Sequence, residues 1–126
     1  MQELSAVKFE EKKSRFFTHL YEVKNPGELD DIINIHHKSY RKAAHHCSAI
    51  YFTAKSGWNQ VESFKNDREV GHPGKALLEI LKKHSLDSHV LVVSRLFGGI
   101  KLGPGGVTRA FRKAGEHAVM HHLKAD

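Results

Sequence analysis

The chain has 126 residues, of which 40% are hydrophobic and 27% charged. This is the composition of an ordinary folded protein, and the length suits one domain, expected over residues 1–126. Cys47 is the only cysteine, so a reducing compartment is expected. The densest apolar run, Val90–Val93, is too short to span a bilayer, and no secretory signal pattern opens the chain. We therefore expect a soluble cytoplasmic protein with no membrane partner.

Positive charge is concentrated in a few stretches. The chain has 20 Lys and Arg against 14 Asp and Glu, a formal net charge of +6. No acid occurs from Ser88 through Gly115, and two more basic stretches lie at 12–15 and 36–46. Such clusters attract phosphates, acidic proteins or anionic membranes, although they also serve simply to keep a surface soluble. The acid-free stretch contains Arg95, Lys101, Arg109, Arg112 and Lys113; the others contain Lys12, Lys13, Arg15, Lys38, Arg41 and Lys42.

The first half of the chain predicts two strands, a helix and a further pair of strands. Apolar and polar residues alternate in 7–11 and 15–23, as in half-buried strands. A helix is predicted next, with Asn25 as its cap, Pro26 in its first turn and Glu28 placed for a capping box. Its apolar stripe includes His36, which we expect to be packed with its hydrogen bonds satisfied. Strands are predicted at 47–54 and 60–65, and Trp58 in the turn between them either stacks on a base or covers the core.

The second half predicts a loop, two helices and a strand. Residues 66–74 form a polar loop in which Asp67 and Glu69 are expected to be solvated, although they could instead face the basic stretch or hold magnesium. A helix with an apolar stripe over 76–84 follows. Residues 90–97 predict a strand covered on at least one face, and the last helix is predicted from about Gly106 to His122.

The predicted order is therefore β-β-α-β-β-α-β-α in an α+β fold. Two hairpins favour a mixed or largely antiparallel sheet with the helices on one face, which is a two-layer α/β sandwich.

The segment Gly98–Gly106 is the most informative part of the sequence. It places five glycines between a strand and a helix: Gly98, Gly99, Gly103, Gly105 and Gly106. The first N–H groups of a helix lack intrahelical partners and attract anions, and Arg109 near that end repels the helix dipole unless an anion is present. The spacing matches neither a P-loop nor a dinucleotide fingerprint. The segment thus predicts an anion site, with a tight turn that needs glycine only for its shape as the alternative.

Residues Arg95–Phe111 closely resemble the signature R-x-F-G-G-x-x-L-G-x-G-G-x-x-R-A-[FY] of the IMPACT family. Lys12-Lys13-Ser14-Arg15-Phe16 and Ala44-His45-His46-Cys47 resemble two further motifs of that family. The resemblance implies the two-layer fold of a ribosomal-protein domain, shared with a domain of elongation factor G and with GHMP kinases. It also implies a place in translational control, where eukaryotic members compete for a ribosome-associated activator of an initiation-factor kinase. Prokaryotic members are suspected of binding nucleic acid or ribosomes.

The sequence departs from the family at its middle loop. The usual D-G-E-P-S-G-T-A-G is here Asp67-Arg68-Glu69-Val70-Gly71-His72-Pro73-Gly74, which is one residue shorter and lacks the threonine. We also expect neither the N-terminal domain of eukaryotic members nor the C-terminal domain of bacterial members, so their route to kinase regulation is not expected here.

Two other groups of residues have ordinary structural interpretations. His117 and His121 have the i, i+4 spacing of a chelating pair, but a closed metal site needs four ligands, and solvated or structural histidines are favoured. Cys47 and His46 are neighbours on a strand and point to opposite faces, which favours a buried structural cysteine over a nucleophile. We assign no catalytic residue, no metal and no cofactor.

Three functions remain after these observations. The first is a non-catalytic module that binds RNA or the ribosome through Lys101, Arg109, Arg95 and the glycine backbone, with Arg112 and Lys113 beside them and Lys12, Lys13 and Arg15 widening the contact. The second is an adapter that binds a protein partner in translational control. The third is an enzyme acting on a phosphorylated small molecule.

Overall fold

The computed structural model describes residues 1–53 and 60–125. The α+β class and the predicted order of elements are confirmed, while the turn that contains Trp58 lies outside the described residues. The elements are strands β1 (Gln2–Glu11) and β2 (Ser14–Glu22), helix α1 (Glu28–Ser39), strands β3 (His45–Phe52) and β4 (Val61–Lys65), helix α2 (Pro73–Lys83), strand β5 (His89–Leu96) and helix α3 (Gly103–Leu123).

The five strands form one sheet in the order β1-β2-β5-β3-β4. Every neighbouring pair is antiparallel, as the two hairpins predicted. The last strand in the chain therefore lies in the middle of the sheet, between β2 and β3. Its first seven residues are all buried, so the sheet is built around β5.

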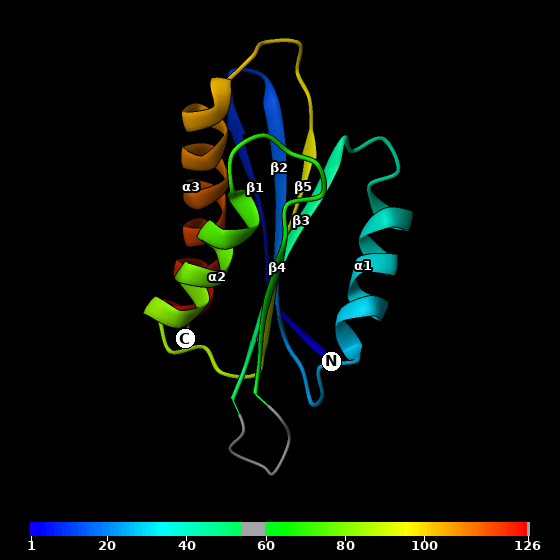
Figure 1. The fold of residues 1–126 in the computed structure, drawn as a ribbon, viewed down its shortest axis with the longest axis vertical. Helices are drawn as coiled ribbons and strands as arrows, with labels where there is room; N and C mark the ends of the chain where they lie inside the picture. Colours follow the sequence, from blue (N-terminus) through cyan, green and yellow to red (C-terminus); the bar gives the residue numbers. More distant parts are fainter. Residues whose placement is uncertain (54–59, 126) are drawn as a thin grey trace.

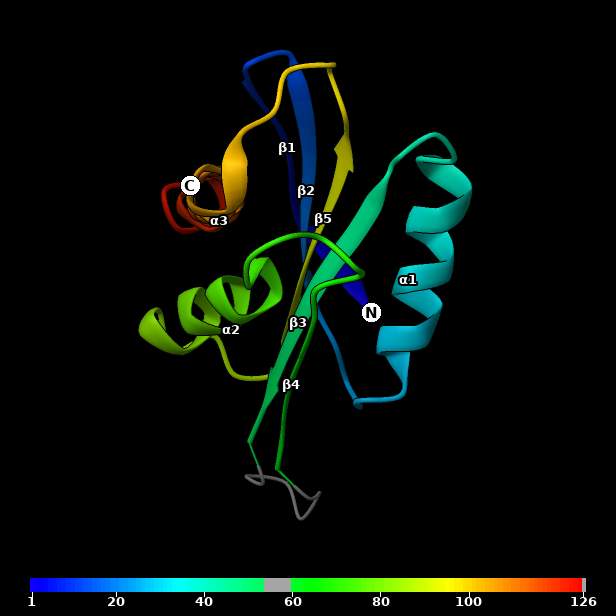
Figure 2. The same ribbon diagram turned by 45° about the horizontal axis from the view of Figure 1, so that its top comes forward.

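The helices lie on both faces of the sheet, and the expectation that they would share one face is wrong. Helices α2 and α3 cover one face and form the predicted two layers with it, while α1 lies against the opposite face (Figures 1 and 2). Alternate residues of β5 enter the two cores: Leu91 and Val93 pack toward α2 and α3, and Val90 and Val92 pack with α1. The run Val90–Val93 has no polar alternation because both of its faces are buried.

Helix α1 begins later than predicted, because its capping residues form a turn. The Glu28 and Leu29 N–H groups donate to the carbonyls of Asn25 and Pro26, and the helix starts after Gly27 without a side-chain cap. The Glu28 carboxylate accepts a hydrogen bond from the Lys24 N–H, one residue before the position expected for a capping box.

Four connections lie at one end of the sheet (Figure 1). We call this the junction end, and it consists of the β1–β2 turn at residues 12–13, the α1–β3 loop at 40–44, the loop at 66–72 and the glycine-rich junction at 97–106. The first two carry basic stretches that are distant in sequence from the junction. No helix in the described ranges is long and apolar enough to cross a membrane.

Candidate nucleic-acid interface at the glycine-rich junction

The junction is shaped by glycine at three positions. Gly99 and Gly103 have φ angles of +88° and +72°, which side-chain-bearing residues rarely adopt. At Gly98, an added Cβ would lie 2.0 Å from the Lys13 carbonyl oxygen, so the chain passes directly against the β1–β2 turn. This contact brings the basic turn at Lys12 and Lys13 beside the junction.

Helix α3 begins at Gly103 rather than at Gly106, so the second half of the glycine segment is its first turn. No side chain caps this end, no acid occurs in the first turn, and Pro104 has no N–H to offer. The N–H groups of Gly103 and Gly105 are among those that a helix leaves without internal partners. The Arg109 guanidinium lies back over this turn, because a Cβ at Gly105 would meet its Nη1 at 3.3 Å.

The structure separates the predicted cations into paired and unpaired groups. Lys113 lies 3.2 Å from Glu11, and Arg112 lies 3.9 Å from Glu79. Within residues 1–53 and 60–125, five of the predicted site residues have no ion-pair partner within 4.0 Å, and all five are exposed: Lys12, Lys13, Arg15, Lys101 and Arg109.

Arg95 differs from these cations because it is buried and already bound. Its side chain is only 7% exposed and lies 2.9 Å from the Glu69 carboxylate, and its other terminal nitrogen donates to Ser14 Oγ at 3.3 Å. Its guanidinium also lies over the rings of Phe16 and Phe97, 5.7 and 5.5 Å from their centroids. Glu69, expected to be solvated, is buried instead, and it is the acid that balances the charge of Arg95.

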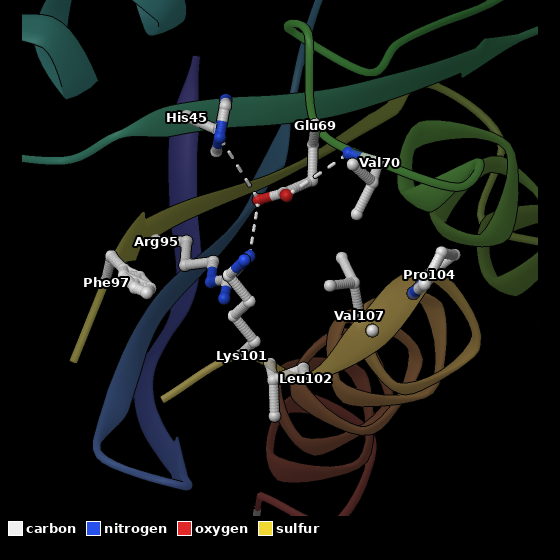
Figure 3. Close-up of a pocket in the computed structure, with 10 residues that line it drawn as sticks. His45, Glu69, Val70, Arg95, Phe97, Lys101, Leu102, Pro104 and Val107 are labelled. Atoms are coloured by element: carbon white, nitrogen blue, oxygen red, sulfur yellow. Dashed lines mark hydrogen bonds and ion pairs between the residues drawn. The ribbon is translucent and has the colours of Figure 1, made fainter. Parts of the chain in front are cut away.

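A pocket of about 410 Å³ opens between this ion pair and the start of α3 (Figure 3). Its polar lining consists of His45, Glu69, Arg95 and Lys101. The remaining lining is largely apolar: Val70, Phe97, Leu102, Gly103, Pro104 and Val107. The volume lies within the range of small-molecule sites, about 300–1,000 Å³.

The loop at residues 66–72 holds Glu69 in place through a set of hydrogen bonds. Asp67 accepts from the His46 N–H at 2.7 Å, and its carbonyl lies 2.8 Å from His45 Nδ1. Asn66 Oδ1 accepts from the Gly74 N–H at 2.8 Å, at the start of α2. The Glu69 N–H donates to the Asn66 carbonyl, which closes a tight turn at Asp67 and Arg68.

Arg68 is strained in this turn, and replacing it with glycine is expected to stabilise the protein. Its φ angle is +61°, which costs a residue with a Cβ about 1 kcal/mol, and the usual family loop has glycine at this place. We expect Arg68→Gly to raise the free energy of unfolding by about 1 kcal/mol, measured by urea denaturation. Arg68→Ala removes the same charge but keeps the Cβ, and an equal gain in that variant would contradict the explanation.

A histidine cluster lies on the opposite face of the sheet, beneath α1. Ser94 Oγ lies 2.9 Å from His36 Nδ1 and 2.8 Å from His46 Nδ1, and Tyr21 Oη lies 3.1 Å from His36 Nε2. Burial, followed by the nearby His19, lowers the pKa of His36 to about 3. The expectation of a packed His36 with satisfied hydrogen bonds is confirmed.

The other singled-out residues have structural roles. Cys47 is fully buried, its thiol donates to the Asn66 carbonyl, and burial raises its pKa far above the usual range, which confirms the structural interpretation. The His117 ring packs edge-on against Phe9, with centroids 5.5 Å apart. In the part of the chain that the structure describes, no three His, Cys, Asp or Glu side chains are placed to hold a metal ion.

Several pocket residues were not identified from the sequence. His45 and Phe97 lie in two of the motifs quoted above, but neither was predicted to line a binding pocket. Val70, Leu102 and Val107 carry no local signal, because their place in a pocket depends on how the 66–72 loop meets α3. The sequence feature that came nearest to indicating the pocket was the pair of acids Asp67 and Glu69 in the loop before Gly71, because one alternative placed them against the basic stretch.

Comparisons with known proteins agree with this architecture and with the motifs. Residues 12–119 match the Impact N-terminal domain. The chain is 38% identical to IMPACT family member YvyE of Bacillus subtilis over 111 residues, which is 87% of this chain and 50% of that protein. It is 30% identical to the protein IMPACT homolog of Caenorhabditis elegans over 98 residues, covering 75% of this chain and 38% of the relative. The chain thus spans about half the length, or less, of these relatives.

Two solved structures share the fold. A crystal structure of a hypothetical protein superposes with a TM-score of 0.83 at 28% identity, over 95% of this chain and 61% of that one. The two-domain translational regulator Yih1 superposes with a TM-score of 0.61 at 19% identity, over 96% of this chain and 46% of that one, which shows a shared fold. With a domain match over residues 12–119 and the junction signature in place, the chain belongs to the IMPACT family.

Proposed function

We propose that this protein binds RNA, on or beside the ribosome, through its junction end, and that it acts in translational control. One observation carries the proposal: exposed cations without ion-pair partners in the described residues gather around an uncapped helix N-terminus that has no acid. Lys101 lies in the junction, the Arg109 guanidinium lies over Gly105 in the first turn of α3, and the Lys12–Lys13 turn packs against Gly98.

The physical chemistry of this arrangement suits a phosphate backbone. A phosphate at the start of α3 gains backbone N–H donors together with the positive end of the helix dipole. Several separated cations at one end of the molecule suit a polyanion better than a single small anion, because each neutralised phosphate releases counterions. The setting in translation is supported by the name of one structural neighbour, the two-domain translational regulator Yih1.

Titration against ribosomes and short single-stranded RNA at several salt concentrations tests the proposal. We expect affinity to fall steeply with salt, and Lys101→Ala to reduce the slope of log K against log salt by about 0.7. Lys24→Ala is the matched control, because Lys24 is an exposed lysine in the connection between β2 and α1. This connection lies at the opposite end of the sheet from the junction (Figure 1). Lys24→Ala should leave the slope unchanged.

Failure to bind any RNA or ribosome at low salt would contradict the proposal. Capture of a stoichiometric protein complex that survives RNase treatment, without RNA binding, would favour the adapter function.

A further inference from the structure

The pocket beside the junction has features that phosphate binding leaves unexplained. Phosphate contacts need cations and N–H groups, whereas most of this pocket is apolar. Phe97 is 48% exposed and Val70 is 51% exposed. Exposed aromatic and apolar side chains next to unpaired cations are typical of surfaces that receive unstacked bases of single-stranded RNA.

Phe97 supplies an exposed aromatic surface on which a base can stack, and the buried guanidinium of Arg95 lies beside it in the pocket lining. The Arg95 guanidinium lies 5.5 Å from the Phe97 ring centroid, and its ion pair with Glu69 fixes its position. Bases stack on aromatic rings and on guanidinium planes in RNA-binding proteins. Leu102, Pro104 and Val107 line the opposite side of the pocket, across from the ion pair (Figure 3).

The polar lining favours a particular kind of base. His45 Nδ1 lies 2.8 Å from the Asp67 carbonyl, which can only accept, so this nitrogen carries the proton in the neutral ring. His45 Nε2 is then an acceptor, and it lies 3.6 Å from Glu69 Oε2, which already accepts from Arg95 Nη1 and has a second lone pair. A donor that carries two hydrogens can bond to both of these acceptors. The exocyclic amino groups of adenine, cytosine and guanine are such donors, and uracil has none.

We propose that this pocket binds one unstacked nucleobase that carries an exocyclic amino group. The ring lies against Phe97 and Arg95, and the amino group donates to His45 Nε2 and Glu69 Oε2. The inference rests on the proposed function, since Lys101 and Arg109 hold the neighbouring phosphates. A pocket of this kind makes the protein selective for single-stranded over duplex RNA, because paired and stacked bases cannot enter it.

Binding at neutral pH to oligo(A), oligo(C) and oligo(U) of equal length, and to an RNA duplex, tests the inference. Oligo(A) and oligo(C) should bind about tenfold more tightly than oligo(U), in line with the discrimination that paired hydrogen bonds to a base edge give. Phe97→Ala should weaken oligo(A) binding about tenfold. Phe64→Ala is the matched control, an equally exposed phenylalanine on β4 away from the pocket, and it should have no effect.

His45→Ala separates the amino contact from stacking. It should remove part of the preference for oligo(A) over oligo(U), because Glu69 Oε2 remains as an acceptor, and it should leave oligo(U) binding unchanged. Thermal melting confirms that the variant folds. Equal binding of duplex and single strands, no effect of Phe97→Ala, or equal affinity for oligo(A) and oligo(U) in the unmodified protein would overturn the inference while the proposed function stands. No binding of any RNA would overturn both.

Discussion

Replacing Glu69 with alanine is expected to lower the free energy of unfolding by about 3–5 kcal/mol. The substitution leaves the guanidinium of Arg95 buried without its counter-charge, at a site where only 7% of that side chain is exposed. An uncompensated buried charge is costly because it has lost its water and gains nothing in return. Urea denaturation at neutral pH measures the change.

Further variants show whether the unpaired charge is the cause. Glu62→Ala removes an exposed carboxylate that lies 3.0 Å from Lys82, and it should cost less than about 1 kcal/mol. Adding Arg95→Met to Glu69→Ala should recover part of the loss, since it removes the orphaned charge and keeps much of the volume. The single variant Arg95→Met completes the comparison. If the stability lost in the double variant equals the sum of the losses in Glu69→Ala and Arg95→Met, the pair does not act through its charge.

The second large effect is a loss of stability in acid that arises from His36. Burial, and then the nearby His19, His46 and His37, lower the pKa of His36 to about 3, and burial also lowers the pKa of His46. In the unfolded chain each histidine takes up its proton near pH 6.5. The unfolded state therefore binds more protons between pH 6.5 and 3, and stability present above pH 6.5 is lost as the pH falls through this range.

The slope of this loss is the measurable quantity. Each such histidine contributes about 1.4 kcal/mol per pH unit. His36→Asn should lower the free energy of unfolding at pH 7, because it disrupts the hydrogen bonds to Tyr21 and Ser94. Between pH 6.5 and 5, however, its free energy of unfolding should fall by about 2 kcal/mol less than that of the unmodified protein. His121→Gln, at an exposed position on α3, is the control and should keep the full slope. An unchanged slope in His36→Asn would show that other groups titrate.

Local patterns in the sequence were enough to predict the class and the order of elements. Alternation predicted the hairpin strands, because one side of each strand meets the core, and helical spacing predicted the apolar faces of all three helices. The glycine segment identified the junction, since the positive φ angles of Gly99 and Gly103 are a local requirement for glycine. The unbroken apolar run of β5 also contained the evidence for cover on both faces, although we expected helices on only one.

Other features depend on contacts between distant parts of the chain, and only the tertiary structure decided them. The 66–72 loop meets the end of β5, which buries Glu69 against Arg95 and turns one predicted surface cation into part of a pocket wall. Acids from β1 and α2 lie near Lys113 and Arg112, whereas Lys101 and Arg109 stay free of ion pairs within the described residues. Charge pairing depends on which side chains are neighbours in space, and spacing along the chain carries that information only within a single helix or strand.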